Sequence, residues 1–422
     1  MLQSMKIEGG YPLVGEINIS GAKNLALPAM VTTLLTEDEI ILNNIPDLSD
    51  VYSLLGLLEY LGCDINIDKV NSKLTLKTTS IKYTEAPYDF VRKMRATILV
   101  LGPMVARFGA ASVSFPGGCA IGVRAIDLHI KALQLLGAEV TMDNGFINVC
   151  APNGLKGCEI TFPIITVTGT ENSIMAAVLA KGTTKLINAA LEPEVEALCN
   201  LLNSMGAKIT GQGTSIINIE GVEKLHGTTF DIIPDRIEAG TYAIASAITH
   251  GKLFLKNCIY KHLALFFNTL KLNGISIEEK QNGVMVENNN DKINPINICT
   301  APYPGFATDL QAQYMALMAI SGGTSLITET LFENRFMHVS ELNRMGANIN
   351  IKGNTATVKG VNKLSGAQVM ATDLRASASL ILAGLFANGI TTVNRLYHID
   401  RGYESIDKKL QQCGAHIKRI SI

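Results

Sequence analysis

The chain has 422 residues and a formal net charge of −1, from 36 lysine and arginine residues against 37 aspartate and glutamate residues. Hydrophobic residues make up 47% and charged residues only 17%, which excludes a disordered or coiled-coil protein. The near-zero charge argues against nucleic-acid and anionic-membrane partners, and the length indicates two or three domains.

Neither end of the sequence resembles a targeting signal, and no window reaches the roughly 18 apolar residues of a membrane span. The eight cysteines are scattered without a CxxC pair. This pattern is typical of reduced thiols rather than of a disulfide framework or a zinc site. We therefore expect a cytoplasmic protein without a metal centre.

An internal repeat organises the chain. An amphipathic helix that ends at a glycine and runs into an alternating strand is predicted six times, at intervals of 68 to 75 residues. The period is too long for a short-repeat solenoid and fits a compact subdomain. The six glycines are Gly62, Gly137, Gly206, Gly274, Gly346 and Gly414.

A second kind of helix, rich in alanine, serine and glycine, alternates with the amphipathic ones. It is predicted to begin near residues 170, 239, 311 and 374. Small residues permit close packing, so these helices are expected to be buried and the amphipathic ones to lie outside. The repeat thus predicts an α/β fold with helices inside the sheets.

Six repeats can form one ring or two groups of three, and composition does not decide between them. Two groups predict domains of about 200 residues with a boundary near 233–235. The stretch before Lys23 must pair somewhere and could complete the second domain. The chain would then cross twice between domains, which leaves a cleft suited to a ligand.

The first polar motif is SGAKNLALPA at 20–29, where Lys23 and Asn24 follow a glycine. One interpretation is an ordinary helix start with a solvated lysine. The other is an anion site, in which the ammonium group and the amides of a helix start converge on a ligand.

The most informative stretch is SFPGGCAIGVRAIDLHI at 114–130. Its glycines surround Cys119, and Arg124 and Asp127 follow. A free cysteine is most often a small apolar residue. A thiol beside an arginine in a glycine-rich loop can instead act as a proton donor or, when ionised, as a nucleophile.

A third motif is TVTGTEN at 166–172, before a small-residue helix. It has neither the lysine of a P-loop nor a GxGxxG pattern. No motif in the chain indicates a cofactor.

In the second half, Asp235, Asp309 and Asp373 occupy equivalent positions in the repeat. Helix N-capping explains all three, although one of them could also be a base. Arg335, Arg375 and Arg401 lie in short polar motifs. Ion pairing explains each one alone, and together with Lys23 and Arg124 they provide enough donors for a carboxylate and a phosphate.

Taken together, nine motifs resemble the UDP-N-acetylglucosamine 1-carboxyvinyltransferase family of enolpyruvyl transferases. Their order and spacing agree with the family from near the N-terminus to the last helix. They are SGAKN at 20–24, MRATILVLGP at 94–103, PGGCAIGVRAIDLHI at 116–130, EPE at 192–194, PDRIEAGT at 234–241, ATDLQAQ at 307–313, TETLFENRFMHV at 328–339, LSGAQVMATDLRASAS at 364–379 and YHIDRGYE at 397–404.

The resemblance implies two inside-out α/β barrel domains of three repeats each. It places the first at 23–234, carrying the Cys119 loop, and the second at 1–22 with 235–422, with the active site in the cleft between them. It implies phosphoenolpyruvate and UDP-N-acetylglucosamine as small-molecule substrates. A monomer is compatible with this reading.

The resemblance also implies roles for individual residues. Cys119 would donate a proton to phosphoenolpyruvate, and Asp309 would take the proton of the sugar hydroxyl or hold that hydroxyl in line. The residues it implies in catalysis are Cys119, Asp309, Lys23, Asp373 and Arg401. Those it implies in substrate binding are Lys23, Asn24, Arg95, Arg124, Ala125, Ile126, Asp127, Leu128, Thr166, Val167, Thr168, Asp309, Leu331, Arg335, Arg375 and Arg401.

One departure from the family pattern affects the third motif. Many members have Ser-Val-Gly where this chain has Thr166, Val167 and Thr168, so contacts to a pyrophosphate there are less well supported by the resemblance than the role of Cys119. Two alternatives remain. One is a 3-phosphoshikimate 1-carboxyvinyltransferase, which shares the six-repeat plan, and the other is a non-catalytic nucleotide-sugar-binding paralogue.

Overall fold

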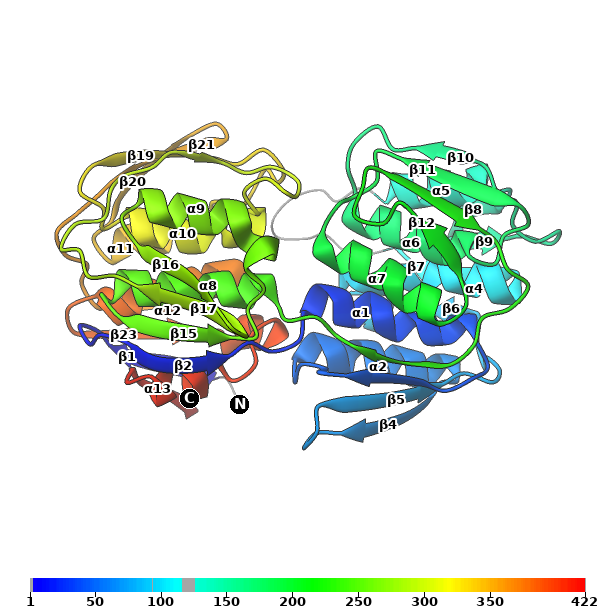
Figure 1. The fold of residues 1–422 in the computed structure, drawn as a ribbon, viewed down its shortest axis with the longest axis horizontal. Coiled ribbons are helices and arrows are strands. Elements are labelled where there is room, and N and C mark those ends of the chain that lie inside the picture. Colours follow the sequence, from blue (N-terminus) through cyan, green and yellow to red (C-terminus); the bar gives the residue numbers. More distant parts are fainter. Residues whose placement is uncertain (1–2, 93, 116–125, 422) are drawn as a thin grey trace. The chain divides into compact units, whose positions relative to one another are not determined.

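The computed structural model describes residues 3–92, 94–115 and 126–421. These residues form two compact units (Figure 1). Unit 1 consists of residues 3–20 and 234–421, and unit 2 consists of residues 21–115 and 126–233. The chain therefore begins in unit 1, passes through unit 2 and returns to unit 1.

Unit 2 alternates helices and short strands. Its helices are α1 (Lys23–Val31), η1 (Thr32–Leu35), α2 (Ser49–Leu61), α3 (Tyr88–Val91), η2 (Arg95–Val100), α4 (Leu101–Phe108), α5 (Asp127–Leu135), α6 (Val167–Ala177) and α7 (Pro193–Ser204). Its strands are β3 (Ile40–Asn43), β4 (Asp64–Asp68), β5 (Lys73–Lys77), β6 (Glu85–Ala86), β7 (Ala110–Ser114), β8 (Glu139–Asp143), β9 (Phe146–Cys150), β10 (Glu159–Thr161), β11 (Thr183–Ile187), β12 (Lys208–Thr210), β13 (Ile216–Glu220) and β14 (Thr228–Asp231).

Unit 1 is built in the same way. Its helices are α8 (Arg236–Ile248), η3 (Tyr260–Leu263), α9 (Ala264–Leu272), η4 (Thr308–Leu310), α10 (Gln311–Met318), α11 (Val339–Arg344), α12 (Leu374–Phe386), η5 (Leu396–Arg401) and α13 (Ile406–Gln412). Its strands are β1 (Gln3–Glu8), β2 (Val14–Asn18), β15 (Lys252–Lys256), β16 (Ser276–Lys280), β17 (Gly283–Glu287), β18 (Ile298–Cys299), β19 (Thr324–Thr328), β20 (Asn348–Lys352), β21 (Thr355–Lys359), β22 (Gln368–Met370), β23 (Ile390–Asn394) and β24 (His416–Ser421).

The strands of each unit's described residues form three four-stranded sheets with one shared pattern. The orders are β14-β3-β5-β4, β6-β7-β9-β8 and β10-β11-β13-β12 in unit 2, and β2-β15-β17-β16, β18-β19-β21-β20 and β22-β23-β1-β24 in unit 1. In every sheet the first pair of strands is parallel and the next two pairs are antiparallel. The common topology is the structural form of the sequence repeat.

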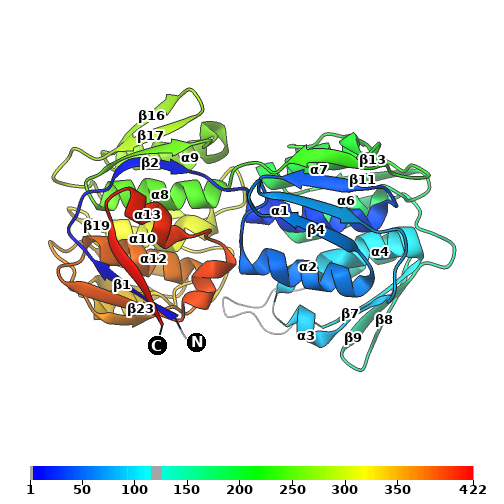
Figure 2. The same ribbon diagram turned by 90° about the horizontal axis from the view of Figure 1, so that it is seen from below.

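The first strands of the chain complete two sheets of unit 1. Strand β1 lies between β23 and β24, antiparallel to both, and β2 pairs in parallel with β15. Figure 2 shows β1 beside β24, and β2 over α8. Residues from opposite ends of the sequence thus form one sheet.

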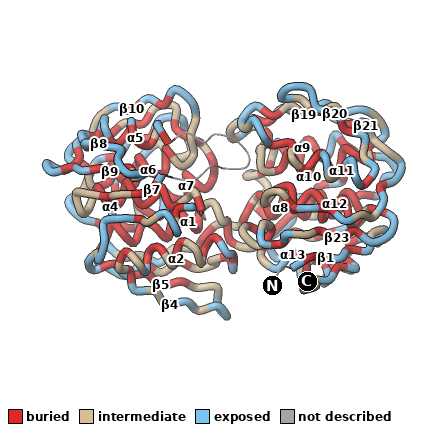
Figure 3. Tube along the Cα trace, turned by 180° about the vertical axis from the view of Figure 1, so that it is seen from behind, coloured by how far each residue is buried: buried red, intermediate tan, exposed pale blue. Residues whose placement is uncertain are grey.

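The helices rich in small residues are the buried ones, as the sequence analysis predicts. All residues of α8 from Ile237 to Ile248 are buried, and so is every residue of α10. In unit 1, α8, α10 and α12 contact one another. Exposed residues lie mainly along the outer strands and loops of the unit (Figure 3). The prediction of helices inside the sheets is confirmed.

The six glycines that were predicted to end the amphipathic helices all adopt positive φ. Gly62, after α2, has φ of +116°, and the other five have φ between +95° and +99°. Glycine reaches this left-handed region at little cost, which is why it ends these helices. The predicted end of the amphipathic helix is confirmed at each of them.

A close backbone contact recurs at equivalent positions in the two units. A Cβ atom on Gly221, which follows β13, would lie 1.6 Å from the carbonyl oxygen of Ala180. In unit 1, a Cβ atom on Gly360, which follows β21, would lie 1.8 Å from the carbonyl oxygen of Ser321. Only a residue without a side chain fits at these two positions.

Gly221→Ala is therefore expected to lower the free energy of unfolding by about 2 kcal/mol or more, because the backbone at Ala180 must move away. Gly145→Ala is the matched control. A Cβ there meets nothing within 4 Å, and its φ of +80° costs only about 1 kcal/mol. Urea unfolding followed by circular dichroism measures both. Equal losses would show that the contact does not constrain the fold.

Candidate active site

The structure distributes the predicted site residues over both units. Cys119, Arg124 and Ala125 lie outside the described residues. Unit 1 carries Asp309, Leu331, Arg335, Asp373, Arg375 and Arg401, and unit 2 carries Lys23, Asn24, Arg95, Ile126, Asp127, Leu128, Thr166, Val167 and Thr168.

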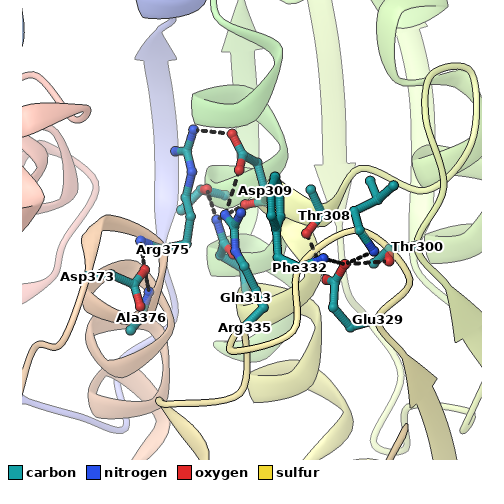
Figure 4. Close-up of polar contacts among 12 residues, drawn as sticks. Thr300, Thr308, Asp309, Gln313, Glu329, Phe332, Arg335, Asp373, Arg375 and Ala376 are labelled. Atoms are coloured by element: carbon teal, nitrogen blue, oxygen red, sulfur yellow. Dashed lines mark hydrogen bonds and ion pairs between the residues drawn. The ribbon is translucent and has the colours of Figure 1, made fainter. Parts of the chain in front are cut away.

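Asp309 is the centre of the group in unit 1. It lies in η4, before α10, and its carboxylate bridges two arginines (Figure 4). Oδ1 is 2.5 Å from Nη2 of Arg335, and Oδ2 is 2.8 Å from Nη2 of Arg375. The arginine side chains are only 4% and 7% exposed, whereas the Asp309 side chain is 26% exposed. One partly accessible carboxylate thus pairs with two buried guanidinium groups and offsets one of their two positive charges.

The two arginines also determine how Asp309 ionises. Burial raises the pKa of the carboxyl, but the charges of Arg375 and Arg335 overcome that effect and hold the pKa of Asp309 well below its ordinary value. Asp309 is therefore ionised at neutral pH and is a weak base. It is suited to accepting a hydrogen bond from a hydroxyl and holding that hydroxyl in place.

The prediction that Asp235, Asp309 and Asp373 all cap helices is wrong for Asp309. Asp235 accepts hydrogen bonds of 2.7 and 3.0 Å from the first amides of α8, and Asp373 accepts bonds of 2.9 and 3.1 Å from those of α12. Asp309 makes no such bond, since its carboxylate faces the guanidinium groups of two arginines. Charge-assisted bonds are the stronger ones.

A buried hydroxyl network holds Arg375 toward Asp309. The hydroxyl of Tyr403 lies 2.8 Å from Oγ1 of Thr241 and accepts bonds from Nε2 of Gln313, at 3.1 Å, and Nη1 of Arg375, at 3.2 Å. Gln313 also donates to the backbone oxygen of Asp309, at 2.9 Å. Sequence reasoning gave no role to Tyr403, Gln313 and Thr241. Gln313 and Thr241 lie on small-residue helices, Tyr403 lies between η5 and α13, and the contacts among the three join distant parts of the sequence.

Leu331 lies in a turn shaped by the buried carboxylate of Glu329. Oε1 accepts bonds from the amides of Leu331, at 2.8 Å, and Phe332, at 3.2 Å, and from the hydroxyl of Thr300, at 2.9 Å. Oε2 accepts a 2.7 Å bond from the hydroxyl of Thr308, which belongs to η4 (Figure 4). Glu329 therefore ties this turn to η4.

His338 lies near Asp373, and Arg401 ends η5, an element that packs against α12. Burial lowers the pKa of His338 to about 4, although Asp373 opposes the shift. The imidazole is neutral near pH 7, so the positive charge of this region comes from arginine.

In unit 2, Lys23 begins α1 and pairs with Asp50 in the first turn of α2. Nζ of Lys23 is 2.6 Å from Oδ2 of Asp50, and the side chains are 12% and 4% exposed. The alternative of a solvated lysine is therefore wrong. Asn24 follows on α1 and is half-buried.

The other predicted residues of unit 2 gather at two helix starts. Ile126 precedes α5, and Asp127 and Leu128 begin it. The 166–168 run forms the start of α6, where the hydroxyl of Thr166 accepts a 3.3 Å bond from the amide of the third helical residue.

His129 joins these two helix starts. Nε2 of His129 on α5 is 3.2 Å from Oγ1 of Thr168 on α6. Burial and the positive charge of Arg95, at the start of η2, lower the pKa of His129 to about 4. Sequence reasoning quoted His129 inside a motif and gave it no role, because its partners lie on another helix about 40 residues further along the chain.

The described ranges 3–92, 94–115 and 126–421 contain no group of three or more His, Cys, Asp or Glu side chains that could hold a metal ion. They also contain no helix long and apolar enough to cross a membrane. The described cysteines are all free thiols.

The ion pairs of Asp309 lead to a stability prediction. Asp309→Asn removes the carboxylate that pairs with two buried guanidinium groups and should lower the free energy of unfolding by about 2–4 kcal/mol at pH 7, toward the lower figure because Asp309 is partly exposed. Since the folded pKa lies below that of the unfolded chain, this stabilisation is present above a pH of about 4 and is lost as the pH falls further.

Asp373→Asn is the matched control, because asparagine caps a helix as well as aspartate does. Thermal or urea unfolding of the two variants beside the parent chain measures the difference. If Asp309→Asn were as stable as Asp373→Asn, the ion pairs would contribute nothing to folding.

The chain is similar to enolpyruvyl transferases over its full length. A family profile described as EPSP synthase (3-phosphoshikimate 1-carboxyvinyltransferase) matches residues 7–410. Two relatives are each named UDP-N-acetylglucosamine 1-carboxyvinyltransferase. The one from Granulibacter bethesdensis is 54% identical over 100% of both chains, and the one from Gluconobacter oxydans is 52% identical over 98% of this chain and 99% of its own.

Two solved structures share the fold. The enolpyruvyl transferase NikO from Streptomyces tendae superposes with a TM-score of 0.90 at 23% identity, covering 100% of this chain and 99% of its own. EPSP synthase from Acinetobacter baumannii superposes with a TM-score of 0.78 at 17% identity, covering both chains fully. At these identities the likeness concerns the fold, which is the two-domain inside-out α/β fold of six repeats.

Proposed function

The chain belongs to the UDP-N-acetylglucosamine 1-carboxyvinyltransferase family of enolpyruvyl transferases, and we propose that it transfers the enolpyruvyl group of phosphoenolpyruvate to the 3′-hydroxyl of UDP-N-acetylglucosamine with release of phosphate. The observation that carries this proposal is the identity of 54% and 52%, over nearly the whole chain, with relatives that bear this name.

The two alternatives have less support. A shikimate 3-phosphate acceptor is suggested by the family profile and by a structure that is 17% identical. A non-catalytic paralogue is disfavoured because the chain retains Cys119, Lys23 and Asp309 together with their arginines.

The reaction is an addition followed by an elimination. The 3′-oxygen of the sugar forms a bond to C2 of phosphoenolpyruvate while C3 takes a proton from the thiol of Cys119, and the hydroxyl gives up its proton to the carboxylate of Asp309 or to water. C3 then returns a proton to the Cys119 thiolate, the C2–O bond to the phosphoryl group breaks, and phosphate leaves with the bonding electrons. C2 becomes electrophilic only as C3 is protonated, so a proton donor and an acceptor for the hydroxyl must act together.

Cationic side chains hold the anionic substrate. Lys23, Arg124 and Arg401 bind the carboxylate and phosphate of phosphoenolpyruvate, with Asn24 beside the reacting atoms. Such groups stabilise the charge that grows on the departing phosphate. The pairing of Lys23 with Asp50 supports this role, because it orients the ammonium group before substrate arrives.

Asp309 acts on the sugar hydroxyl. Its low pKa and its two ion pairs support a role as a hydrogen-bond acceptor that holds the hydroxyl in line for attack on C2. Arg335, Arg375 and Asp373 support it by fixing its position and charge.

A separate set of residues is assigned to the nucleotide sugar. Arg95, the 124–128 run and the 166–168 run contact the uridine diphosphate and sugar, and Leu331 is assigned to the same ligand. The half-exposed residues at the starts of α5 and α6 support this assignment.

The biological setting follows from the reaction. The product begins the synthesis of peptidoglycan precursors, so the enzyme acts in the cytoplasm of a bacterium and contributes to cell shape and division. It requires no cofactor. Its reactive thiol also makes Cys119 the site at which fosfomycin would form a covalent adduct.

The acceptor is tested by a phosphate-release assay. Purified protein with phosphoenolpyruvate should release phosphate when UDP-N-acetylglucosamine is added and release none with shikimate 3-phosphate. Release with shikimate 3-phosphate alone would favour the first alternative. Absence of release with either acceptor would favour the non-catalytic paralogue.

The role of Cys119 is tested by Cys119→Ala. Without the proton donor, turnover should fall by about 10²-fold or more, and mass spectrometry should find the fosfomycin adduct on the parent protein and not on the variant. Cys150→Ala, at an exposed thiol with no assigned role, is the matched control. Full activity in Cys119→Ala would exclude the thiol as proton donor.

A further inference from the structure

Three side chains form a hydrogen-bonded chain that runs from the interior of unit 2 to the start of α6. The amide of Gly102 lies 2.8 Å from Oδ1 of Asn172, and Nδ2 of Asn172 lies 3.1 Å from Nδ1 of His129. Nε2 of His129 then lies 3.2 Å from Oγ1 of Thr168. Asn172 is 1% exposed and His129 is 3% exposed.

The donor and acceptor at each step follow from the chemistry of the groups. A backbone N–H can only donate, so the atom of Asn172 that faces Gly102 is the amide oxygen. The amide nitrogen of Asn172 therefore faces His129, and because an NH₂ group can only donate, Nδ1 of His129 must accept. The ring proton of neutral His129 then resides on Nε2, which donates to the oxygen of Thr168.

This arrangement turns the hydroxyl hydrogen of Thr168 away from His129. Its oxygen already accepts from His129, so the hydrogen must be donated elsewhere. Thr168 is half-buried at the start of α6, and in the described part of the chain the one hydrogen bond of its hydroxyl is the bond with His129.

We propose that Asn172 and His129 are positioning residues that direct the Thr168 hydroxyl hydrogen toward a phosphoryl oxygen of the nucleotide sugar. The inference rests on the proposed function, because it takes the 166–168 run as part of the nucleotide-sugar site. In this proposal the 166–168 run recognises the phosphoryl group through the Thr168 hydroxyl, and the buried side chains of Asn172 and His129 set the direction of that hydroxyl.

The chain of bonds can be reversed by one substitution of equal size. In Asn172→Asp, one carboxylate oxygen still accepts from Gly102, and the other now accepts from His129. The ring proton moves to Nδ1, Nε2 becomes an acceptor, and the Thr168 hydrogen turns inward. At about pH 8.5, about two units above the ordinary pKa of imidazole, the Kd for UDP-N-acetylglucosamine should rise about tenfold, with the KM for phosphoenolpyruvate unchanged within about twofold.

Variants of Thr168 distinguish a loss of the directed hydroxyl from a general loss of folding. Thr168→Val should raise the same Kd about tenfold, and Thr168→Ser, which returns the hydroxyl, should restore it. Asn172→Asp in the Thr168→Val background should add nothing further, because the hydroxyl it redirects is gone. Thr141→Val, on the exposed side of β8, is the matched control.

Two measurements decide the outcome. Calorimetric titration with UDP-N-acetylglucosamine gives each Kd, and ¹⁵N NMR of His129 shows which ring nitrogen carries the proton. A proton on Nδ1 in the parent protein, or equal Kd values for Thr168→Val and the parent, would overturn the inference. If the parent protein binds the nucleotide sugar but releases no phosphate, the proposed function fails. The ratio of each variant's Kd to that of the parent protein still tests the inference. If the parent protein does not bind the sugar, both fail.

Discussion

Close packing of helices with small residues is the constraint on which the described structure depends. In unit 1, α8, α10 and α12 contact one another, and the alanine, serine and glycine residues along them let their backbones approach. The sheets can surround them only because these helices occupy little volume. Polar side chains along such a core need buried partners, as Thr241 and Gln313 have. Most of the residues proposed for chemistry lie near helix starts instead, where backbone amides and partial exposure offer them partners.

The few charged groups at these helix starts are held in ion pairs. Asp309 serves two arginines at once, and Lys23 is paired with Asp50. Pairing leaves few uncompensated charges inside the domains and fixes the position of each charged group. Partners of this kind hold Lys23, Asp309, Arg335 and Arg375 in place, and groups held in place lower the cost of alignment for the proposed reaction.

Sequence periodicity predicted much of the fold, since its signals are local. The glycine after α2 and its five equivalents need positive φ, and Asp235 and Asp373 cap the helices they precede. The same reasoning failed for Asp309, because Arg335 and Arg375 come from 26 and 66 residues further along the chain. Ion pairing over such separations leaves no local pattern.

The sequence by itself determined the α/β class, the six repeats, the buried helices and, through its motifs, the family. Only the tertiary structure decided that Asp309 is a doubly paired anion, that Lys23 is not solvated and that Asn172 sets the proton position of His129. The physical reason is that repeats and caps depend on neighbours within a few residues. Ionisation states and hydrogen-bond directions depend instead on groups that folding brings together from distant parts of the chain.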